Sequence, residues 1–413
     1  MKTITTKKLT TATYVTLMLL ILASPAPAYP PDPDNAALLY YQSYIAYEKA
    51  DDTMQDMVAD LARGKIEPNE RIKNYIENCR GSINLALAAT EIPNCNWGLK
   101  YSEGFSMQMY HLAQTRKLVF IIGAEIRILA AEGAYRQALD RCFTVRKIGK
   151  HVGDETPISF LVSMSIDKMV ASHIQDILAD MPQDLETLTW LKTKLAEVPF
   201  KTPSLRVAMR SEKECFSAEM RVEKRDELLA MCSGSGDVGK GNRATALSLV
   251  LNEDRLEKME TKRLAEGDEA FFTRNRDYYI KHMNSLDEVL ESSMPYAEVY
   301  SRLKQLNEKP VKEITENPAA TLTALLVPAF GNIYSIEIRT KTISNSVRTA
   351  VKIYIIKAKT GKLPDTLPAG LPGDLFSSKP FKYEKNADGF ILNCQGKDLA
   401  KDETYKYEFK VKK

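Results

Sequence analysis

The chain has little of the residues and motifs that most enzyme chemistry requires. Four histidines occur in 413 residues, and neither an H-E-x-x-H nor a C-x-x-C motif is present. Because a zinc site needs three or four converging ligands, the sequence predicts no metal site and no cofactor. The G-x-S-x-G turn that carries the nucleophile of many hydrolases is also missing. A cysteine–histidine pair that assembles only in the folded chain remains open, since sequence spacing does not exclude it.

A complete phosphate-binding loop is missing as well. Residues 234–241, GSGDVGKG, match the G-x-x-x-x-G-K part of the nucleotide-binding pattern, but Gly241 stands where a serine or threonine should hold magnesium. The preceding residues, RVEKRDELLAMC, have the pattern of an amphipathic helix rather than of a buried strand. We therefore interpret residues 234–241 as a loop between helices.

Acidic residues are missing from the first 28 positions, which carry three lysines. The apolar run that follows this basic start, residues 14–23, is shorter than the about 20 residues of a membrane-spanning helix. Ala26 and Ala28 form the small-x-small pattern that signal peptidase reads, so cleavage is expected after Ala28. The sequence thus predicts an exported protein, periplasmic or extracellular. An uncleaved membrane anchor is the alternative.

The chain that remains after this cleavage has no net charge. It carries 54 basic and 54 acidic residues, which predicts no general attraction to nucleic acid or to anionic membranes. A second long apolar run is missing too, because the best candidate, residues 321–336, is interrupted by Pro328 and Gly331. We therefore expect no stable membrane span after signal cleavage.

Cysteines are few but even in number, so all of them could pair in disulfides in an exported chain. Six cysteines allow 15 pairings, and the sequence does not choose among them. Cys79 and Cys95 flank a short helical segment and form the best candidate disulfide. Unpaired buried thiols are the alternative. The six are Cys79, Cys95, Cys142, Cys215, Cys232 and Cys394.

Helical patterns dominate what is present. Residues 29–320 read as a helical domain of packed hairpins, irregular or solenoid-like, with a possible break near 232–243. Within it, Thr156 is placed to cap a helix that begins at Pro157. In residues 321–413, a regular helix over 343–358 ends at Gly361, and the segments GFILN and TYKYEFKVK have strand patterns. The predicted fold is mainly α with a small C-terminal α+β module.

Two groups of residues are candidates for binding. Trp97 and Tyr101 lie in a distinctive loop, residues 94–104, where they could form a binding surface or fill a gap between helical hairpins. The second group is a basic helix face that could dock an acidic partner or lipid headgroups, or simply be solvated. It consists of Lys341, Arg348, Lys352 and Lys359.

Nearly the whole mature chain resembles a family of exported, uncharacterised helical proteins of planctomycete-type bacteria. The resemblance lies in a C-x-W-G-L loop before a long helix and in a later turn similar to H-x-G-x-x-P-T-L-I-S. It implies an exported helical protein and no particular activity. The matching residues are Cys95, Trp97, Gly98, Leu99, His151, Gly153 and Ser159.

Residues 348–398 resemble the C-terminal part of the major pseudopilins of type II secretion. The resemblance implies a shared small fold element and a calcium loop that would use Asp398 and Asp402. Leu375, Ser378 and Cys394 depart from the family pattern, and the pseudopilin N-terminal helix is absent. The matching residues are Tyr354, Gly361, Pro364, Leu367, Asp374, Pro380, Tyr383, Gly396 and Asp398.

Together these features favour a non-catalytic exported protein that binds an unknown protein partner or scaffolds an assembly in the cell envelope. An exported hydrolase whose site forms only in the fold is one alternative. The other is an envelope component that docks on a secretion or pilus-like machine through residues 340–413.

Overall fold

The computed structural model describes most of the chain after residue 31. It covers residues 32–153, 156–197, 204–226, 228, 261, 265, 267–314 and 316–411. The signal segment with Ala28, the expected break near 232–243, Cys232 and the loop 234–241 all lie outside the described residues.

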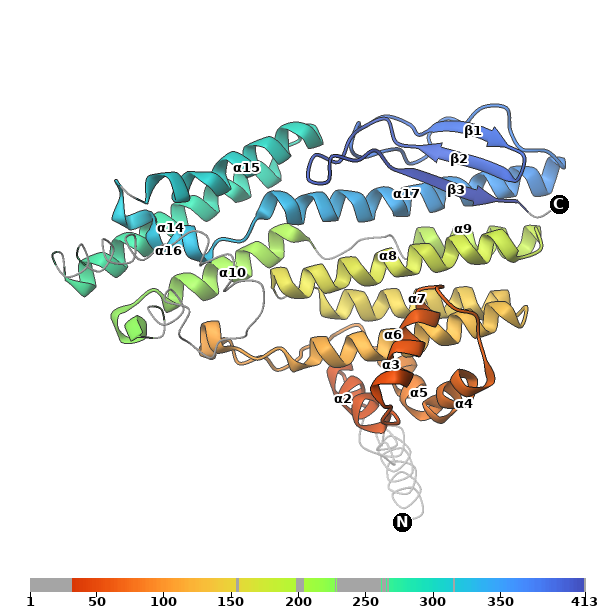
Figure 1. Cartoon of the computed structure of the whole chain (residues 1–413), viewed down its shortest axis with the longest axis horizontal. Coiled ribbons are helices and arrows are strands. Elements are labelled where there is room, and N and C mark those ends of the chain that lie inside the picture. Colours follow the sequence, from red (N-terminus) through yellow and green to blue (C-terminus); the bar gives the residue numbers. More distant parts are fainter. Residues whose placement is uncertain are drawn as a thin grey trace, which may run out of the picture.

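Helices make up most of the described chain, and a small antiparallel sheet closes its C-terminal end (Figure 1). The predicted fold, mainly α with a small C-terminal α+β module, is confirmed. The α-helices are α2 (Ala36–Ala46), α3 (Asp52–Ala62), α4 (Glu70–Asn78), α5 (Arg80–Ala89), α6 (Tyr110–Ala131), α7 (Tyr135–Val152), α8 (Pro157–Asp180), α9 (Leu185–Glu197), α10 (Leu205–Glu219), α14 (Asp268–Glu291), α15 (Tyr296–Glu313), α16 (Thr321–Leu326) and α17 (Phe330–Thr360). Three short 3-10 helices are η1 (Tyr101–Ser106), η2 (Val222–Lys224) and η3 (Pro318–Ala320), and the strands are β1 (Lys382–Asn386), β2 (Gly389–Asn393) and β3 (Lys406–Lys410).

The elements are stacked in layers from the N-terminal edge to the C-terminal edge (Figure 1). Helices α2 to α5 form the first edge and pack on α6, which packs in turn on α7 and α8. Helix α17 packs on α8 and α9, and the sheet packs on α17 and, through β3, on α8. Helix α2 and the sheet therefore occupy opposite edges of the molecule.

Local sequence signals explain several helix boundaries. Thr156 caps α8 through its side chain, which accepts a hydrogen bond from the backbone of Ser159, and Pro157 occupies the first helical position. Gly361 ends α17 in the left-handed conformation, with φ of 73°. Both boundaries match the sequence-based predictions.

Helix α17 is longer than its apolar stripe predicts, beginning at Phe330 rather than at 343. The threonine side chains of its added turns, and Ser344 just beyond them, bond to backbone carbonyls four residues earlier. Thr340, Thr342 and Ser344 donate to the carbonyl oxygens of residues 336, 338 and 340. These bonds satisfy the buried hydroxyls inside the helix. Because the residues are polar, the spacing of apolar residues alone does not predict this part of the helix.

The segment before α17 bears on the question of membrane spans. By length and composition alone, one helical stretch of the described chain, Pro318–Thr360, is long and apolar enough to cross a membrane. In the structure this stretch is divided, because α16 ends at Leu326 and the extended Val327 precedes Pro328. The interruption at Pro328 follows the sequence-based expectation.

The three strands pair in the order β1-β2-β3, each antiparallel to its neighbour. In β3, Tyr407 and Phe409 are buried, whereas the alternating Lys406, Glu408 and Lys410 are exposed. This period-two pattern is the one that the sequence predicts, and it directs the aromatic side chains toward α17 and α8.

The C-terminal sheet and the N-terminal helices share one hydrophobic core. It contains Trp97 and α6–α9 residues together with Tyr354, Phe390 and Phe409. A second core is formed by α10, α14, α15, α16 and the beginning of α17, with Phe160 of α8 contributing to it. Helices α8 and α17 enter both cores, so they join the two halves of the molecule.

The candidate disulfide between Cys79 and Cys95 is not formed. All five cysteines within the described residues are thiols. Cys79 is buried at the junction of α4 and α5, and Cys95 follows the far end of α5. The alternative, unpaired thiols, is therefore the one that the structure supports.

Candidate functional site

Trp97 lies inside the protein and not on a binding surface. Its side chain is 3% exposed, and its indole N–H donates to the carbonyl oxygen of His151 over 2.7 Å. The loop around it is held by the amide of Ala36, which donates to the carbonyl of Asn94 over 2.8 Å. This corrects the expectation that Trp97 binds a partner and supports the alternative, in which it fills the gap between helical segments.

An aromatic cluster surrounds the Trp97 ring. The ring stacks on His111, with centroids 4.5 Å apart, and on Tyr40 at 5.3 Å and Tyr44 at 6.4 Å. The hydroxyl of Tyr40 is 2.9 Å from Nδ1 of His151. Burial raises the pKa of both Tyr40 and Tyr44 above the ordinary tyrosine value, so both hydroxyls stay protonated. We call these five side chains, Tyr40, Tyr44, Trp97, His111 and His151, the Trp97 cluster.

Tyr101 does not join the Trp97 cluster at a common surface. It begins η1, and its side chain is 48% exposed, in contrast to Trp97. The structure therefore separates the two residues that the sequence placed together as candidates.

Burial makes His111 sensitive to pH. Its side chain is 2% exposed, neither ring nitrogen has a hydrogen-bond partner among the described residues, and burial lowers its pKa to about 4. In the unfolded chain this pKa lies near 6.5, so the unfolded state binds more protons between the two values. The free energy of unfolding should therefore fall by about 2 kcal/mol between pH 7 and pH 5 through this residue.

Urea unfolding at pH 7 and at pH 5 measures this loss. The variant His111→Phe keeps a ring stacked on Trp97 but removes the titrating group, so its stability should change less between the two pH values. An equal change in the variant and the parent chain would show that His111 does not carry the effect.

The basic face of α17 divides into residues with different environments. Lys341 bonds to Glu337 one turn earlier, at 2.6 Å, and Glu337 is 7% exposed. Arg348 is half-buried and donates from Nη2 to the carbonyl oxygen of Leu195 at the end of α9, over 2.8 Å. Burial lowers the pKa of Arg348. Lys341 and Arg348 thus serve the internal structure in part, and Arg348 fixes α17 to α9.

Lys352 and Lys359 join a residue that the sequence did not indicate. Lys192 of α9 lies against Lys352, and this neighbour, together with partial burial and Lys359, lowers the pKa of Lys352. No carboxylate forms an ion pair with Lys192, Lys352 or Lys359 in the part of the chain that the structure describes. We call these three side chains the lysine cluster.

The position of Lys192 explains why the sequence did not reveal the cluster. It lies 160 residues before Lys352, on a helix whose pairing with α17 has no signal in the sequence. The i, i+7 and i+11 spacing of basic residues on α17 identified only the residues of that helix, and not Lys192 on α9.

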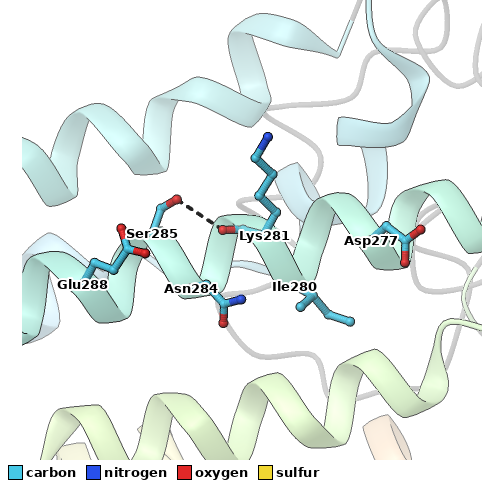
Figure 2. Close-up of a pocket in the computed structure, with 6 residues that line it drawn as sticks. All are labelled: Asp277, Ile280, Lys281, Asn284, Ser285 and Glu288. Atoms are coloured by element: carbon cyan, nitrogen blue, oxygen red, sulfur yellow. Dashed lines mark hydrogen bonds between the residues drawn. The ribbon is translucent and has the colours of Figure 1, made fainter.

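Two open cavities lie along α14. One, of about 390 Å³, is shown in Figure 2, where the lining side chains all come from that helix: Asp277, Ile280, Lys281, Asn284, Ser285 and Glu288. In this cavity the hydroxyl of Ser285 donates to the carbonyl oxygen of Lys281 over 3.2 Å. The other, of about 530 Å³, is lined by residues 267–274. Neither contains Trp97, His151 or the basic face of α17.

The calcium loop implied by the pseudopilin resemblance does not fit these residues. Asp398 is fully buried, and its carboxylate accepts hydrogen bonds from Ser335, Arg339 and Tyr405. These donors outweigh the effect of burial and lower the pKa of Asp398. Asp402 points elsewhere and pairs with Lys397 over 2.6 Å. The guanidinium of Arg339 thus takes the place of a cation at Asp398.

Metal ligands are not gathered elsewhere in the described ranges either, since no group of three or more histidine, cysteine, aspartate or glutamate side chains there could hold an ion. Compared with known proteins, the chain matches no protein-family model, no curated protein and no solved structure.

Proposed function

We propose that the protein is a non-catalytic exported component of the cell envelope that binds an acidic segment of a partner protein at the lysine cluster. The observation that supports this most is the packing of α9 on α17, which brings Lys192 against Lys352. Lys359 lies two turns further along α17, and none of the three lysines pairs with a carboxylate among the described residues. Like charges held this close repel each other, so a bound carboxylate would relieve the repulsion.

The structure around the cluster keeps its two sides in register. Arg348 is one turn from Lys352 on α17 and bonds to the carbonyl of Leu195, which lies one turn from Lys192 on α9. The apolar side chains of Leu191 and Leu195 are buried beneath the seam. The two lysines therefore belong to packed helices and not to a loop, and a partner would meet them already in position.

The rest of the molecule agrees with a binding function. The polar atoms of Trp97, Tyr40 and Tyr44 are used in internal hydrogen bonds, as a packed core requires. The C-terminal residues share their core with the N-terminal helices, so the surface offered to a partner is built from α9 as well as from α17. This favours one binding scaffold over a separate C-terminal docking module.

Charge removal at the cluster tests the proposal. The double variant Lys192→Ser/Lys352→Ser should weaken binding of a hexaglutamate peptide about tenfold, as expected for two screened surface charges. A matched control, Lys281→Ser/Lys304→Ser, removes the same charge from α14 and α15 and should change the affinity little. Fluorescence anisotropy of a labelled peptide at two salt concentrations measures both.

Two results would contradict the proposal. Equal weakening in both double variants would show that only net charge matters. Unchanged peptide binding, with loss of binding to phosphatidylglycerol vesicles in Lys192→Ser/Lys352→Ser alone, would identify a site for lipid headgroups instead. A separate measurement checks the geometry, because the pKa of Lys352, followed by NMR after reductive methylation, should rise when Lys192 is replaced by serine.

A further inference from the structure

Helix α2 has an apolar face that is exposed among the described residues. Its sequence, AALLYYQSYIA, contains no charged residue, and a helix that is apolar on all sides is normally buried. Its inner side is buried at Ala36, Ala37 and Tyr40. Its outer side is exposed by 49% at Leu38, 38% at Tyr41 and 84% at Ile45. The spacings of three and four place these last three residues on one face, which we call the α2 stripe.

The α2 stripe lies where the chain leaves its apolar N-terminal run. Residues 24–35 separate that run, residues 14–23, from the first residue of α2. A connection of this length spans about 40 Å at most. Helix α2 is therefore held near any bilayer that contains the run. Figure 1 places α2 at the edge of the molecule opposite the sheet, where no other labelled element lies outside it.

The chemistry of the α2 stripe fits a lipid interface better than a second copy of the chain. A standard protein interface buries about 800 Å² on each partner, which three side chains do not supply. Helices that lie in the membrane interface bury an apolar face to a shallow depth, and tyrosine is enriched at that level. Tyr41 is 38% exposed, and its hydroxyl donates to the carbonyl oxygen of Trp97 over 2.8 Å, so its polar atom is already satisfied when the exposed part of the residue meets lipid.

We propose that the α2 stripe lies in the lipid interface of the membrane that holds the N-terminal apolar run, for as long as that run remains attached. The bilayer then covers the one apolar face of α2, and the Trp97 cluster behind it fixes the orientation of the helix. Helices α9 and α17, which carry the lysine cluster, lie on the other side of α6 and α7 from α2 (Figure 1). This inference does not depend on the acidic partner proposed above.

Tryptophan scanning tests the contact in the full chain. The unprocessed chain is synthesised in the absence of signal peptidase and reconstituted with vesicles of phosphatidylcholine that is brominated at shallow acyl positions. Ile45→Trp and, separately, Leu38→Trp should show blue-shifted emission and at least twofold quenching relative to the same variant in unbrominated vesicles. Val207→Trp is the matched control, because Val207 is 46% exposed on α10 and should not be quenched.

The emission of Trp97 and Trp190, measured in the parent chain, is subtracted from each variant. Near-UV circular dichroism confirms that the variants, all at exposed positions, remain folded. Absence of quenching at Ile45 and Leu38 would overturn the proposal, whether or not the chain floats with the vesicles. Blue-shifted emission that depends on protein concentration, without quenching by brominated lipid, would also overturn it and assign the α2 stripe to a second copy of the chain.

Discussion

Replacing Asp398 with alanine should lower the free energy of unfolding by about 3 kcal/mol, the cost of removing one partner from a buried ion pair. Asp398 is fully buried, whereas the Arg339 side chain that pairs with it is 17% exposed. The variant leaves this guanidinium partly buried without its counter-charge. It also leaves the hydroxyls of Ser335 and Tyr405 without their acceptor. Water can reach Arg339 in part, so the expected loss lies at the lower end of the range for buried pairs.

Urea unfolding followed by far-UV circular dichroism measures this loss. Asp365→Ala is the control, because Asp365 is exposed and loses only a surface pair with Lys385, which should change stability by less than about 1 kcal/mol. The variant Asp398→Asn keeps the shape but not the charge and should fall between the two. If Asp398→Ala proved as stable as Asp365→Ala, Arg339 would not be acting as the internal cation of this loop.

Acid should act in the same direction on the parent chain. The pKa of Asp398 is lowered in the folded state, so its contribution to stability is present above the ordinary aspartate pKa and is lost as pH falls below it. For His111 the loss of stability begins at a higher pH than for Asp398. It sets in as pH falls below about 6.5, because the unfolded chain then binds a proton that the buried ring does not. The two effects therefore follow one another as pH decreases, with the histidine first.

The architecture could be predicted from the sequence because its signals are local. The cap at Thr156, the stop at Gly361 and the alternation in β3 each depend on a few neighbouring residues, and each is found in the structure. The early start of α17 was not predicted, since serine and threonine side chains that bond within a helix resemble neither an apolar stripe nor a loop.

The candidate sites depended on contacts between distant residues, and here the sequence was a weaker guide. Trp97 in a glycine-containing loop has the same local pattern whether it is buried or exposed. Its burial follows from the packing of α2 and α6 on either side. The sequence does not predict that Lys192 lies near Lys352, because this depends on the packing of α9 against α17. Asp398 matched a calcium loop by pattern, but Arg339, 59 residues earlier in the chain, supplies the positive charge.

The two proposed surfaces lie on different sides of the fold. The α2 stripe lies at the N-terminal edge and the lysine cluster lies beyond α6, α7 and α8, which form the layer between them (Figure 1). The shared core makes this layer continuous from Trp97 to the sheet. For as long as the N-terminal run remains attached, a partner bound at the lysine cluster would be held at a fixed distance from the membrane.

Replacing Trp97 with alanine should lower the free energy of unfolding by about 3–5 kcal/mol, the usual cost of removing a large aromatic side chain from a core. The ring stacks between His111 and Tyr40, and both partners would face the resulting cavity. The carbonyl of His151 would also lose the indole N–H that it accepts. The effect should spread to α2 and α6, because the ring lies between them.

Guanidinium unfolding followed by circular dichroism measures this change, with Trp190→Ala as the control. Trp190 is only partly buried and lies against Arg136, so its replacement should cost about 1–2 kcal/mol. Trp97→Phe keeps most of the stacking and loses the hydrogen bond, which is worth about 1 kcal/mol. A Trp97→Ala chain as stable as the Trp190→Ala chain would contradict the packing role of Trp97.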